Sequence, residues 1–314
     1  MHDSSQLDLV GIGVAAVDEL LELDRFPTVD AKQTMRSHAV QTGGTCINCL
    51  TAAARLGLRC HYAGLLGVDA PSKVVHRGMA DRGVTWTDPP LDPDAGPSHA
   101  FILIDREKGT RTILMDRSRV RPLCPEHLDE QLIRRARAIY VDGLDLAASR
   151  RAAELARRHG AEVVCDFEEN DPDEIRRLLP LIDHVILPAH FATLLSGEAD
   201  PARAASILGD AARRRTIVTC GDEGAWYVER GANVRHQPAF DVDVVDTTGC
   251  GDAFRGAYVA AMLGGDTIDA CVEFASAAAA LSARRLGATA GHPEHQEVVA
   301  LIERAVGAVG DRLS

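Results

Sequence analysis

Between about residues 126 and 219, short Val- and Ile-rich runs alternate with longer stretches in which Ala and Leu recur at helical spacing. A short apolar run is typical of a buried strand, and a longer periodic stretch is typical of an amphipathic helix. The predicted strands are 138–141, 163–166, 184–187 and 216–219. The predicted helices are 146–159, 172–179 and 201–214. This alternation predicts an α/β protein with a central, mostly parallel sheet flanked by helices on both faces.

The first 120 residues are less regular and predict a second, smaller sheet. A strand at 7–12, an Ala-rich helix at 45–56 and a strand at 59–66 continue the α/β pattern. Extended segments within 13–40 and 98–116 have no helix beside them, and the second turns at 107–110 as a hairpin. We therefore expect one α/β domain over residues 1–314, with these segments forming a β lid over one edge of the main sheet.

Charge and cysteine content limit the partners of the chain. It carries 34 Lys and Arg against 46 Asp and Glu, a formal charge of −12, so a broad nucleic-acid contact is not expected. We expect no membrane segment and no secretory signal, because no apolar run is long enough for a span and the first ten residues lack a basic, then apolar, pattern. Eight scattered Cys residues indicate reduced thiols in a cytoplasmic protein, and Cys46-x-x-Cys49 reads as two small core residues.

One glycine pattern resembles a dinucleotide-binding loop but lacks its context. Gly11-x-Gly13-x-x-Ala16 follows a predicted strand, and Asp30 lies near the spacing of a ribose-binding acid. The segment before Phe26-Pro27 is too short for a crossover helix, so we give this interpretation little weight.

The segment 246–256, with the sequence DTTGCGDAFRG, carries the strongest chemical signal. It lies between an extended run at 242–245 and a small-residue helix at 252–263. Gly249 and Gly251 permit a turn whose N–H groups converge on an anion, and the helix N-terminus adds positive potential. Asp252 has two interpretations: it caps the helix, or it is the general base that accepts a proton from an attacking hydroxyl. We favour the second, because capping alone does not explain this loop at the end of a strand.

At this point the sequence resembles the PfkB, or ribokinase-like, family of carbohydrate kinases. Residues 246–256 match its D-T-x-G-x-G-D-x-F signature, Gly43-Gly44-Thr-Cys-Ile-Asn48 resembles its G-G-x-x-x-N signature, and 64–69 resembles its G-x-x-G-x-D element. Order and spacing agree from about residue 8 to residue 293. The resemblance implies a ribokinase-like fold and transfer of the γ-phosphate of ATP, with Mg²⁺, to a hydroxyl of a small sugar.

The resemblance also implies roles for individual residues. Asp252 is the expected catalytic base, with the amides of Gly249, Cys250 and Gly251 as the anion hole. The expected sugar-binding residues are Asp18, Gly43, Gly44 and Asn48, although Asn48 also suits a helix start. The expected nucleotide-binding residues are Thr219, Gly221, Gly224, Ser276 and Gly287, the last in a loop at 287–291. Asp246 and Thr248 fall where K⁺-using members offer backbone carbonyls to the cation.

Three departures from the family pattern have consequences. The N-x-x-E motif, linked to magnesium and phosphate, falls near Pro188-Ala-His-Phe191, so the resemblance does not indicate how Mg²⁺ is placed. Cys250 replaces the more common Ala and puts a thiol near the phosphates, which predicts sensitivity to oxidation. Gly291 replaces a Ser frequent in cation-activated members, which weakens the expectation of K⁺.

The substrate is less constrained than the reaction. Four lid cations either meet an acidic group on the sugar or are solvated; they are Lys32, Arg36, Arg111 and Arg117. Asp142 or Asp145, after the strand at 138–141, is expected to hold a further hydroxyl. Residues 110–118 and 236–246 resemble the ketohexokinase and sulfofructose kinase branch, which favours a ketose or keto-sugar acid. The alternatives are a nucleoside kinase of the same fold and a non-catalytic sugar- or nucleotide-binding relative. An exposed lid edge also predicts a possible homodimer.

Overall fold

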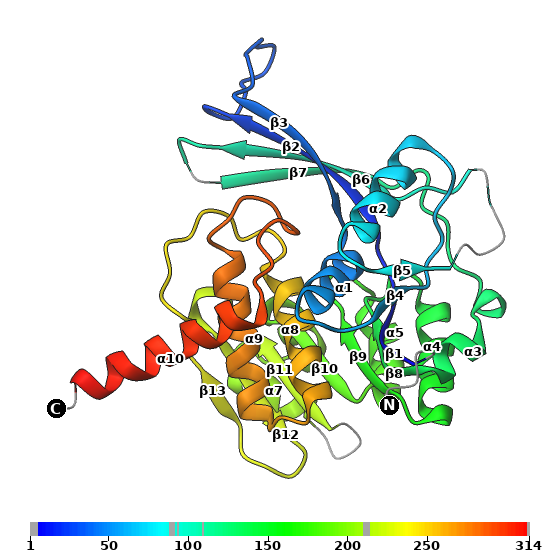
Figure 1. Cartoon of the computed structure of the whole chain (residues 1–314), viewed down its shortest axis with the longest axis vertical. Helices are drawn as coiled ribbons and strands as arrows, with labels where there is room; N and C mark the ends of the chain where they lie inside the picture. The colour runs from blue at the N-terminus through cyan, green and yellow to red at the C-terminus, as the bar shows by residue number, and fades with distance from the viewer. Residues whose placement is uncertain (1–5, 88–91, 93, 109, 210–213, 313–314) are drawn as a thin grey trace.

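The computed structural model describes residues 6–87, 92, 94–108, 110–209 and 214–312, and Figure 1 shows their arrangement. The described residues form a nine-stranded main sheet, in which the strands from β11 to β5 are parallel and β12 and β13 are antiparallel additions at one edge. Its strands in spatial order are β13 (Arg235–Gln237), β12 (Ala225–Glu229), β11 (Arg215–Thr219), β10 (His184–Pro188), β9 (Glu162–Asp166), β8 (Ala136–Val141), β1 (Leu7–Ile12), β4 (Cys60–Tyr62) and β5 (Thr85–Trp86). The mostly parallel sheet predicted from the alternation is confirmed.

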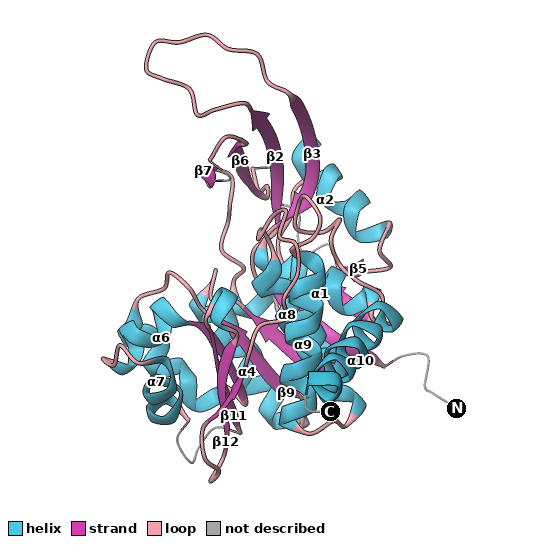
Figure 2. Ribbon diagram, turned by 90° about the vertical axis from the view of Figure 1, so that its left-hand side faces the viewer, coloured by secondary structure: helices cyan, strands magenta, loops and turns pink. Residues whose placement is uncertain are grey.

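Helices cover both faces of this sheet, as Figure 2 shows. One face packs against α1 (Thr45–Arg55), α2 (Ala70–Ala80), α8 (Cys250–Gly264), α9 (Ile268–Ser282) and α10 (His295–Arg312). The other packs against α3 (Glu130–Arg134), α4 (Leu146–His159), α5 (Pro172–Leu178), α6 (Ala189–Ser196) and α7 (Pro201–Leu208). Short 3₁₀ turns lie at η1 (Pro125–His127), η2 (Leu179–Leu181) and η3 (Gly221–Glu223). Strand β10 illustrates why both faces are covered, because its successive side chains point to opposite faces. Ile186 packs in the core on the side of α1, α8 and α9, while Val185 and Leu187 pack in the core on the side of α4, α6 and α7.

A separate sheet of four strands projects from the carboxyl edge of the main sheet and forms the lid (Figure 1). Its order is β3 (Ser37–Gly43), β2 (Ala16–Leu23), β6 (Ser98–Asp105) and β7 (Thr110–Asp116). The predicted lid segments therefore do form a sheet, although its first hairpin extends to residue 43. Every residue of the edge strand β7 is exposed, and dimerisation through this edge stays a prediction.

Strand register decides which lid side chains face the main domain. Asp18 is opposite both Gln41 and Ala100, and Ala100 is opposite Met115, so these four side chains share one face. The next side chains on the same face are Leu20 of β2, Ile102 of β6 and Ile113 of β7, and Arg111 follows two residues beyond Ile113. The inner face of the lid is therefore largely apolar, with Asp18 at its base and Arg111 towards its tip.

As expected from the short segment before Phe26-Pro27, the chain after Gly11-x-Gly13 enters lid strand β2 rather than a crossover helix, and Asp30 lies in the exposed β2–β3 connection. The dinucleotide interpretation is thus excluded. Some other local predictions were wrong. The strand expected at 59–66 is limited to β4, and residues 242–245 form no strand. The helix expected at 201–214 ends at Leu208; residues 210–213, and Gly109 in the predicted hairpin turn, lie outside the described residues. Within the described part of the chain, no helix has the length and apolarity needed to cross a membrane.

Candidate active site

The candidate site lies at the carboxyl edge of the parallel strands, beneath the lid. Strands β1, β8, β9, β10 and β11 all end at this edge, where loops of α/β proteins bind ligands. The N-terminus of α8 reaches the same region from the helical layer, and α1 lies beside it. The fold therefore gathers Asp252, Asn48 and Asp142 from segments far apart in the chain.

Asp252 lies in the first turn of α8 but does not cap it. The N-cap is Gly249, with a left-handed φ of 73°, and the Asp252 side chain instead accepts a 2.8 Å hydrogen bond from Asn48 Nδ2. The capping interpretation is thus wrong. Asp252 is 7% exposed, and burial raises its pKa to about 7, with Arg255 and Asn48 acting in the opposite direction. A carboxylate with a pKa near neutrality is suited to accept a proton from a hydroxyl.

The loop before Asp252 offers free backbone donors. Among the described residues, the N–H groups of Gly249 and Gly251 have no hydrogen-bond acceptor, and that of Cys250 makes only a 3.3 Å bond to Thr247 O. They lie at the N-terminus of a 15-residue helix, where backbone N–H groups and the helix dipole favour an anion. This geometry suits the predicted anion hole.

The Cys250 thiol does not have the properties of a reactive cysteine. Burial raises its pKa to about 12, with Asp246 and Asp252 acting in the same direction. Oxidation requires the thiolate, so this environment opposes the sensitivity expected from the sequence.

Asp18 of β2 and Gly43 of β3 lie next to each other at the base of the lid sheet. Asp18 is 6% exposed, and burial raises its pKa to about 6, partly offset by His99. A Cβ at position 43 would overlap the Asp18 carboxylate, which explains the glycine there. Gly44 follows with φ 94° and is the N-cap of α1.

Asn48 faces the site from within α1. It lies beyond the first residue of the helix, Thr45, so its interpretation as a helix-start residue is wrong. Its side chain is 5% exposed, and its Oδ1 is buried with no hydrogen-bond partner among the described residues. Because the Nδ2 group is held by Asp252, this oxygen is left as an acceptor for a ligand hydroxyl.

The Asp142 carboxylate is occupied by hydrogen bonds from protein groups. It accepts hydrogen bonds from Val14 N at 2.7 Å, Thr45 Oγ1 at 2.6 Å and Leu144 N at 3.0 Å, and burial raises its pKa. It therefore links β1 and β8 to the start of α1. The alternative residue, Asp145, caps α4 by accepting from Ala148 N at 2.9 Å.

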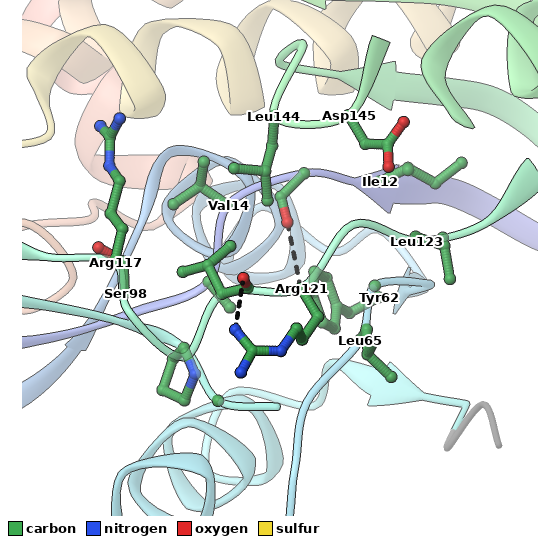
Figure 3. Close-up of a pocket in the computed structure, with 16 residues that line it drawn as sticks. Ile12, Val14, Tyr62, Leu65, Ser98, Arg117, Arg121, Leu123, Leu144 and Asp145 are labelled. Atoms are coloured by element: carbon green, nitrogen blue, oxygen red, sulfur yellow. Dashed lines mark hydrogen bonds between the residues drawn. The ribbon is translucent and has the colours of Figure 1, made fainter. Parts of the chain in front are cut away.

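A small cavity of about 30 Å³ lies beside this link (Figure 3). Its wall includes Tyr62, whose hydroxyl donates a 3.1 Å hydrogen bond to Gly13 O, and Arg121, which donates to Val120 O at 3.3 Å. The Tyr62 bond therefore braces the segment after β1, whereas the Arg121 bond stays within its own loop.

The predicted lid cations have different surroundings. Arg111 extends from β7 to the loop before the anion hole, where its Nη1 donates a 2.7 Å hydrogen bond to Thr247 Oγ1. Lys32 is exposed in the β2–β3 connection. Arg36 pairs with Asp24, and Arg117 lies 3.8 Å from Glu169. Arg111 is thus the lid cation for which the structure shows a contact with the candidate site.

The predicted nucleotide-binding positions lie on neighbouring elements. Thr219 ends β11, and Gly221 and Gly224, with φ of 62° and 90°, form the turn into β12. Ser276 is buried on α9, which packs against β12. Gly287, with φ 86°, precedes α10.

Asp246 joins two of the predicted loops. One carboxylate oxygen accepts from Thr248 N at 2.9 Å and Thr248 Oγ1 at 2.7 Å, and the other accepts from Gly287 N at 2.9 Å. The carboxylate is therefore occupied by protein donors at the positions suggested for K⁺, and a cation there stays a prediction.

The residues 10–295 match the family described as pfkB family carbohydrate kinase, which is most of the chain. The chain belongs to the PfkB family of carbohydrate kinases. It is therefore a phosphotransferase whose acceptor is an alcohol group.

Individual PfkB relatives cover nearly the whole chain. The ribokinase of Haemophilus influenzae is 27% identical over 95% of this chain and 99% of its own. The 2-dehydro-3-deoxygalactonokinase of Haloferax volcanii is 27% identical over 81% of this chain and 86% of its own. Among solved structures, a putative ribokinase from Agrobacterium tumefaciens superposes with a TM-score of 0.85 at 24% identity, over 96% of this chain and 99% of its own. These likenesses confirm the ribokinase-like fold.

The N-x-x-E motif of the PfkB family is absent from this kinase, and the end of β10 and the start of α6 occupy its position. Pro188 ends β10, Ala189 begins α6, and Phe191 is buried in the core, so no carboxylate occupies this position. In the described part of the chain, no cluster of three or more His, Cys, Asp or Glu residues is arranged to hold a metal. Mg²⁺ in phosphotransferases is usually held by substrate phosphates, water and one or two carboxylates, so its position in this kinase stays a prediction.

One buried ion pair in this kinase has no counterpart in the sequence-based predictions. Arg255 lies 2.5 Å from Asp166 at the end of β9, with both side chains almost fully buried, and Tyr140 Oη donates to the same Asp166 at 2.9 Å. An arginine one turn after Asp252, in a stretch of helix that is otherwise uncharged, is the sequence signal that could have identified it.

Proposed function

We propose that this kinase transfers the γ-phosphate of MgATP to a hydroxyl of a small carbohydrate, preferably a ketose or a keto-sugar acid. The observation that carries the proposal is the pairing of Asn48 and Asp252, which places a buried base with a pKa near 7 beside free backbone donors. This arrangement matches the two requirements of phosphoryl transfer, a base for the acceptor and donors for the phosphoryl oxygens.

In the proposed reaction, Asp252 accepts the proton of the sugar hydroxyl as the hydroxyl oxygen forms a bond to the γ-phosphorus. The bond from that phosphorus to the bridging oxygen breaks, and ADP leaves. The N–H groups of Gly249, Cys250 and Gly251 donate to the oxygens on which charge develops. Mg²⁺, carried by the phosphates of ATP, would neutralise part of their charge.

The sugar would lie between α1 and the inner face of the lid. We assign the Asp18 carboxylate and Asn48 Oδ1 as acceptors for sugar hydroxyls, with Gly43 and Gly44 giving the sugar close access to the backbone. The apolar side chains of the lid would exclude water, which prevents simple hydrolysis of ATP. Asp142 is a weaker candidate, because its oxygens already accept three hydrogen bonds.

A keto-sugar acid is favoured by the position of Arg111. Its guanidinium reaches Thr247 from the inner face of the lid, where it would meet an anionic group of the substrate or a phosphate. Two relatives are named as kinases of dehydro-deoxy sugar acids, 2-dehydro-3-deoxygalactonokinase and 5-dehydro-2-deoxygluconokinase. Lys32 would contribute only if the exposed connection folds over the site.

Nucleotide would lie across the turn at Thr219, Gly221 and Gly224 and the segment from Ser276 to Gly287. Related structures include Arabidopsis thaliana ribokinase with ribose and ATP, and a putative ribokinase II from E. coli with ATP and magnesium. A nucleoside acceptor is the second candidate, since the adenosine kinase of Sinorhizobium meliloti has the same fold with a TM-score of 0.78.

A substrate panel tests the proposal. Purified protein is incubated with MgATP and, separately, D-ribose, D-fructose, 2-dehydro-3-deoxygalactonate, 5-dehydro-2-deoxygluconate or adenosine, with and without K⁺, and ADP release is measured. We expect turnover with a keto-sugar or its acid, and a strongly reduced turnover in Asp252→Asn. Turnover only with adenosine would support the nucleoside kinase. Sugar or nucleotide binding without ADP release from any substrate would support a non-catalytic relative.

A further inference from the structure

Arg255 is among the largest fully buried side chains of the described chain, with 1% exposure. It lies three residues after Asp252 on α8, so the two side chains project from neighbouring positions on one side of the helix. Its Nη2 is 2.5 Å from Asp166 and 3.8 Å from Glu168, both on the segment that ends β9. The guanidinium of Arg255 is therefore engaged by protein carboxylates.

The guanidinium also lies beside the anion-hole loop. A Cβ added to Gly251 would lie 2.7 Å from Arg255 Nη1, so Gly251 leaves the space that the arginine occupies. Arg255 is thus close to two parts of the proposed machinery, the turn that donates to the phosphoryl group and the carboxylate that accepts the proton.

The charges around Asp252 are otherwise acidic or neutral. The titratable groups that face it come from α1, β8, β9, the residues after these strands, and α8 itself. They are Cys46, Cys49, Tyr140, Asp142, Asp166, Glu168, Cys250 and Arg255, beside the neutral Asn48 amide. Of these groups, only Arg255 is a cation. Without such a positive charge, a buried carboxylate among other acids would remain protonated at neutral pH.

We propose that Arg255 is a positioning residue that acts through Asp252: its buried positive charge keeps the Asp252 carboxylate ionised near neutral pH, while its guanidinium braces the turn at Gly251. The inference deepens the proposed function, on which it rests, by assigning the group that makes Asp252 available as a base. The ion pair with Asp166 holds the guanidinium in place, and Tyr140 holds Asp166 in turn.

The first test needs no substrate. The free energy of unfolding in urea is measured for the native chain and for Asp252→Asn from about pH 5 to about pH 9, and again with Arg255→Met added to both. Burial raises the pKa of Asp252, so its ionisation destabilises the fold, and Asp252→Asn should gain stability relative to the native chain as the pH rises towards about 7, with no further gain above that pH. With Arg255→Met in both chains, this relative gain should continue to a pH at least about one unit higher before it levels off, equivalent to a tenfold change in the proton affinity of Asp252.

Two further variants separate charge from folding. Arg255→Lys retains the positive charge, so the unfolding titration should give a pKa for Asp252 close to that in the native chain. Arg255→Met combined with Asp166→Asn removes both members of the buried pair, which is tolerated better than removal of one. Because loss of the Asp166 charge itself favours ionised Asp252, the double variant is compared with Asp166→Asn alone, and its titration should lie at higher pH. An unchanged titration in both comparisons, Arg255→Met with the native chain and the double variant with Asp166→Asn, would overturn the proposal.

A second readout uses the sugar that the substrate panel identifies. The turnover number of Arg255→Met at saturating ATP and sugar should be reduced most near pH 6 and should recover by at least about tenfold towards pH 9, relative to native enzyme at each pH. A uniform loss at every pH would indicate a structural role only and would contradict the proposal. If the native chain phosphorylates no substrate, the proposed function fails, while the unfolding titration still decides the role of Arg255.

Discussion

The side-chain amide of Asn48 donates a 2.8 Å hydrogen bond to the carboxylate of Asp252, although 204 residues separate them in the chain. The contact joins α1 to α8, which pack directly against each other beneath the lid. Gly256 makes this approach possible, because a Cβ there would lie 2.6 Å from Cys49 O. The close packing of two helices therefore holds the proposed sugar-binding amide against the proposed base.

Replacement of the base should separate chemistry from binding. In Asp252→Asn we expect the turnover number to fall by roughly 10²–10⁴, with little change in the affinity for sugar, because the amide keeps the shape but accepts no proton. Turnover is measured by ADP release and sugar affinity by calorimetry. Nearly native turnover in a correctly folded variant would refute the base assignment.

Loss of the Asn48 side chain should affect both binding and the pKa of Asp252. Asn48→Ala removes the free Oδ1 and the hydrogen bond that lowers the pKa of Asp252, so we expect sugar affinity to fall about tenfold and the acid limb of the turnover profile to move to higher pH. The measurement is sugar affinity and turnover as a function of pH. Thr51→Ala, at a buried hydroxyl on the same helix that donates to Asn48 O, is a matched control for helix packing.

The pH dependence of sugar affinity should reflect Asp18. Because burial raises the pKa of Asp18 to about 6, the carboxylate is protonated below this value and loses acceptor capacity, so we expect the KM for sugar to rise as the pH falls through 6. The same shift means that ionised Asp18 destabilises the fold above pH 6, so Asp18→Asn should gain stability there. A KM that is independent of pH in the native enzyme, or unchanged in Asp18→Asn, would argue against the assignment.

Gly43 should tolerate no side chain. In Gly43→Ala the new Cβ would overlap the Asp18 carboxylate, so we expect sugar affinity to fall by more than about tenfold. Gly264→Ala is the control, since it lies at the end of α8 with only the Asp266 carboxylate near the new Cβ, at 4.0 Å. This control should keep native activity and gain up to about 1 kcal/mol of stability from helix propensity. Equal effects of the two substitutions would contradict the explanation.

Removal of the Arg111 charge should reveal the substrate class. Arg111→Met should reduce kcat/KM for an acidic keto-sugar by about tenfold or more, and for a neutral sugar by less, if the guanidinium meets the anionic group. Arg106→Met removes another lid arginine, one that pairs with Glu22, and serves as the control. An equal reduction with acidic and neutral sugars would instead place Arg111 on the phosphates.

Much of this architecture follows from the sequence alone, because strands and helices leave periodic patterns that depend on near neighbours in the chain. The alternation from 126 to 219 determined the parallel sheet, and the glycines beside Asp252 determined a donor-rich helix start. Only the tertiary structure decided which groups meet: Asn48 with Asp252, Arg111 with Thr247, and Arg255 with Asp166. It also decided that Asp252 is a buried carboxylate with a raised pKa rather than a helix cap, because pKa values depend on burial and on charges brought together from distant segments, which no local pattern records.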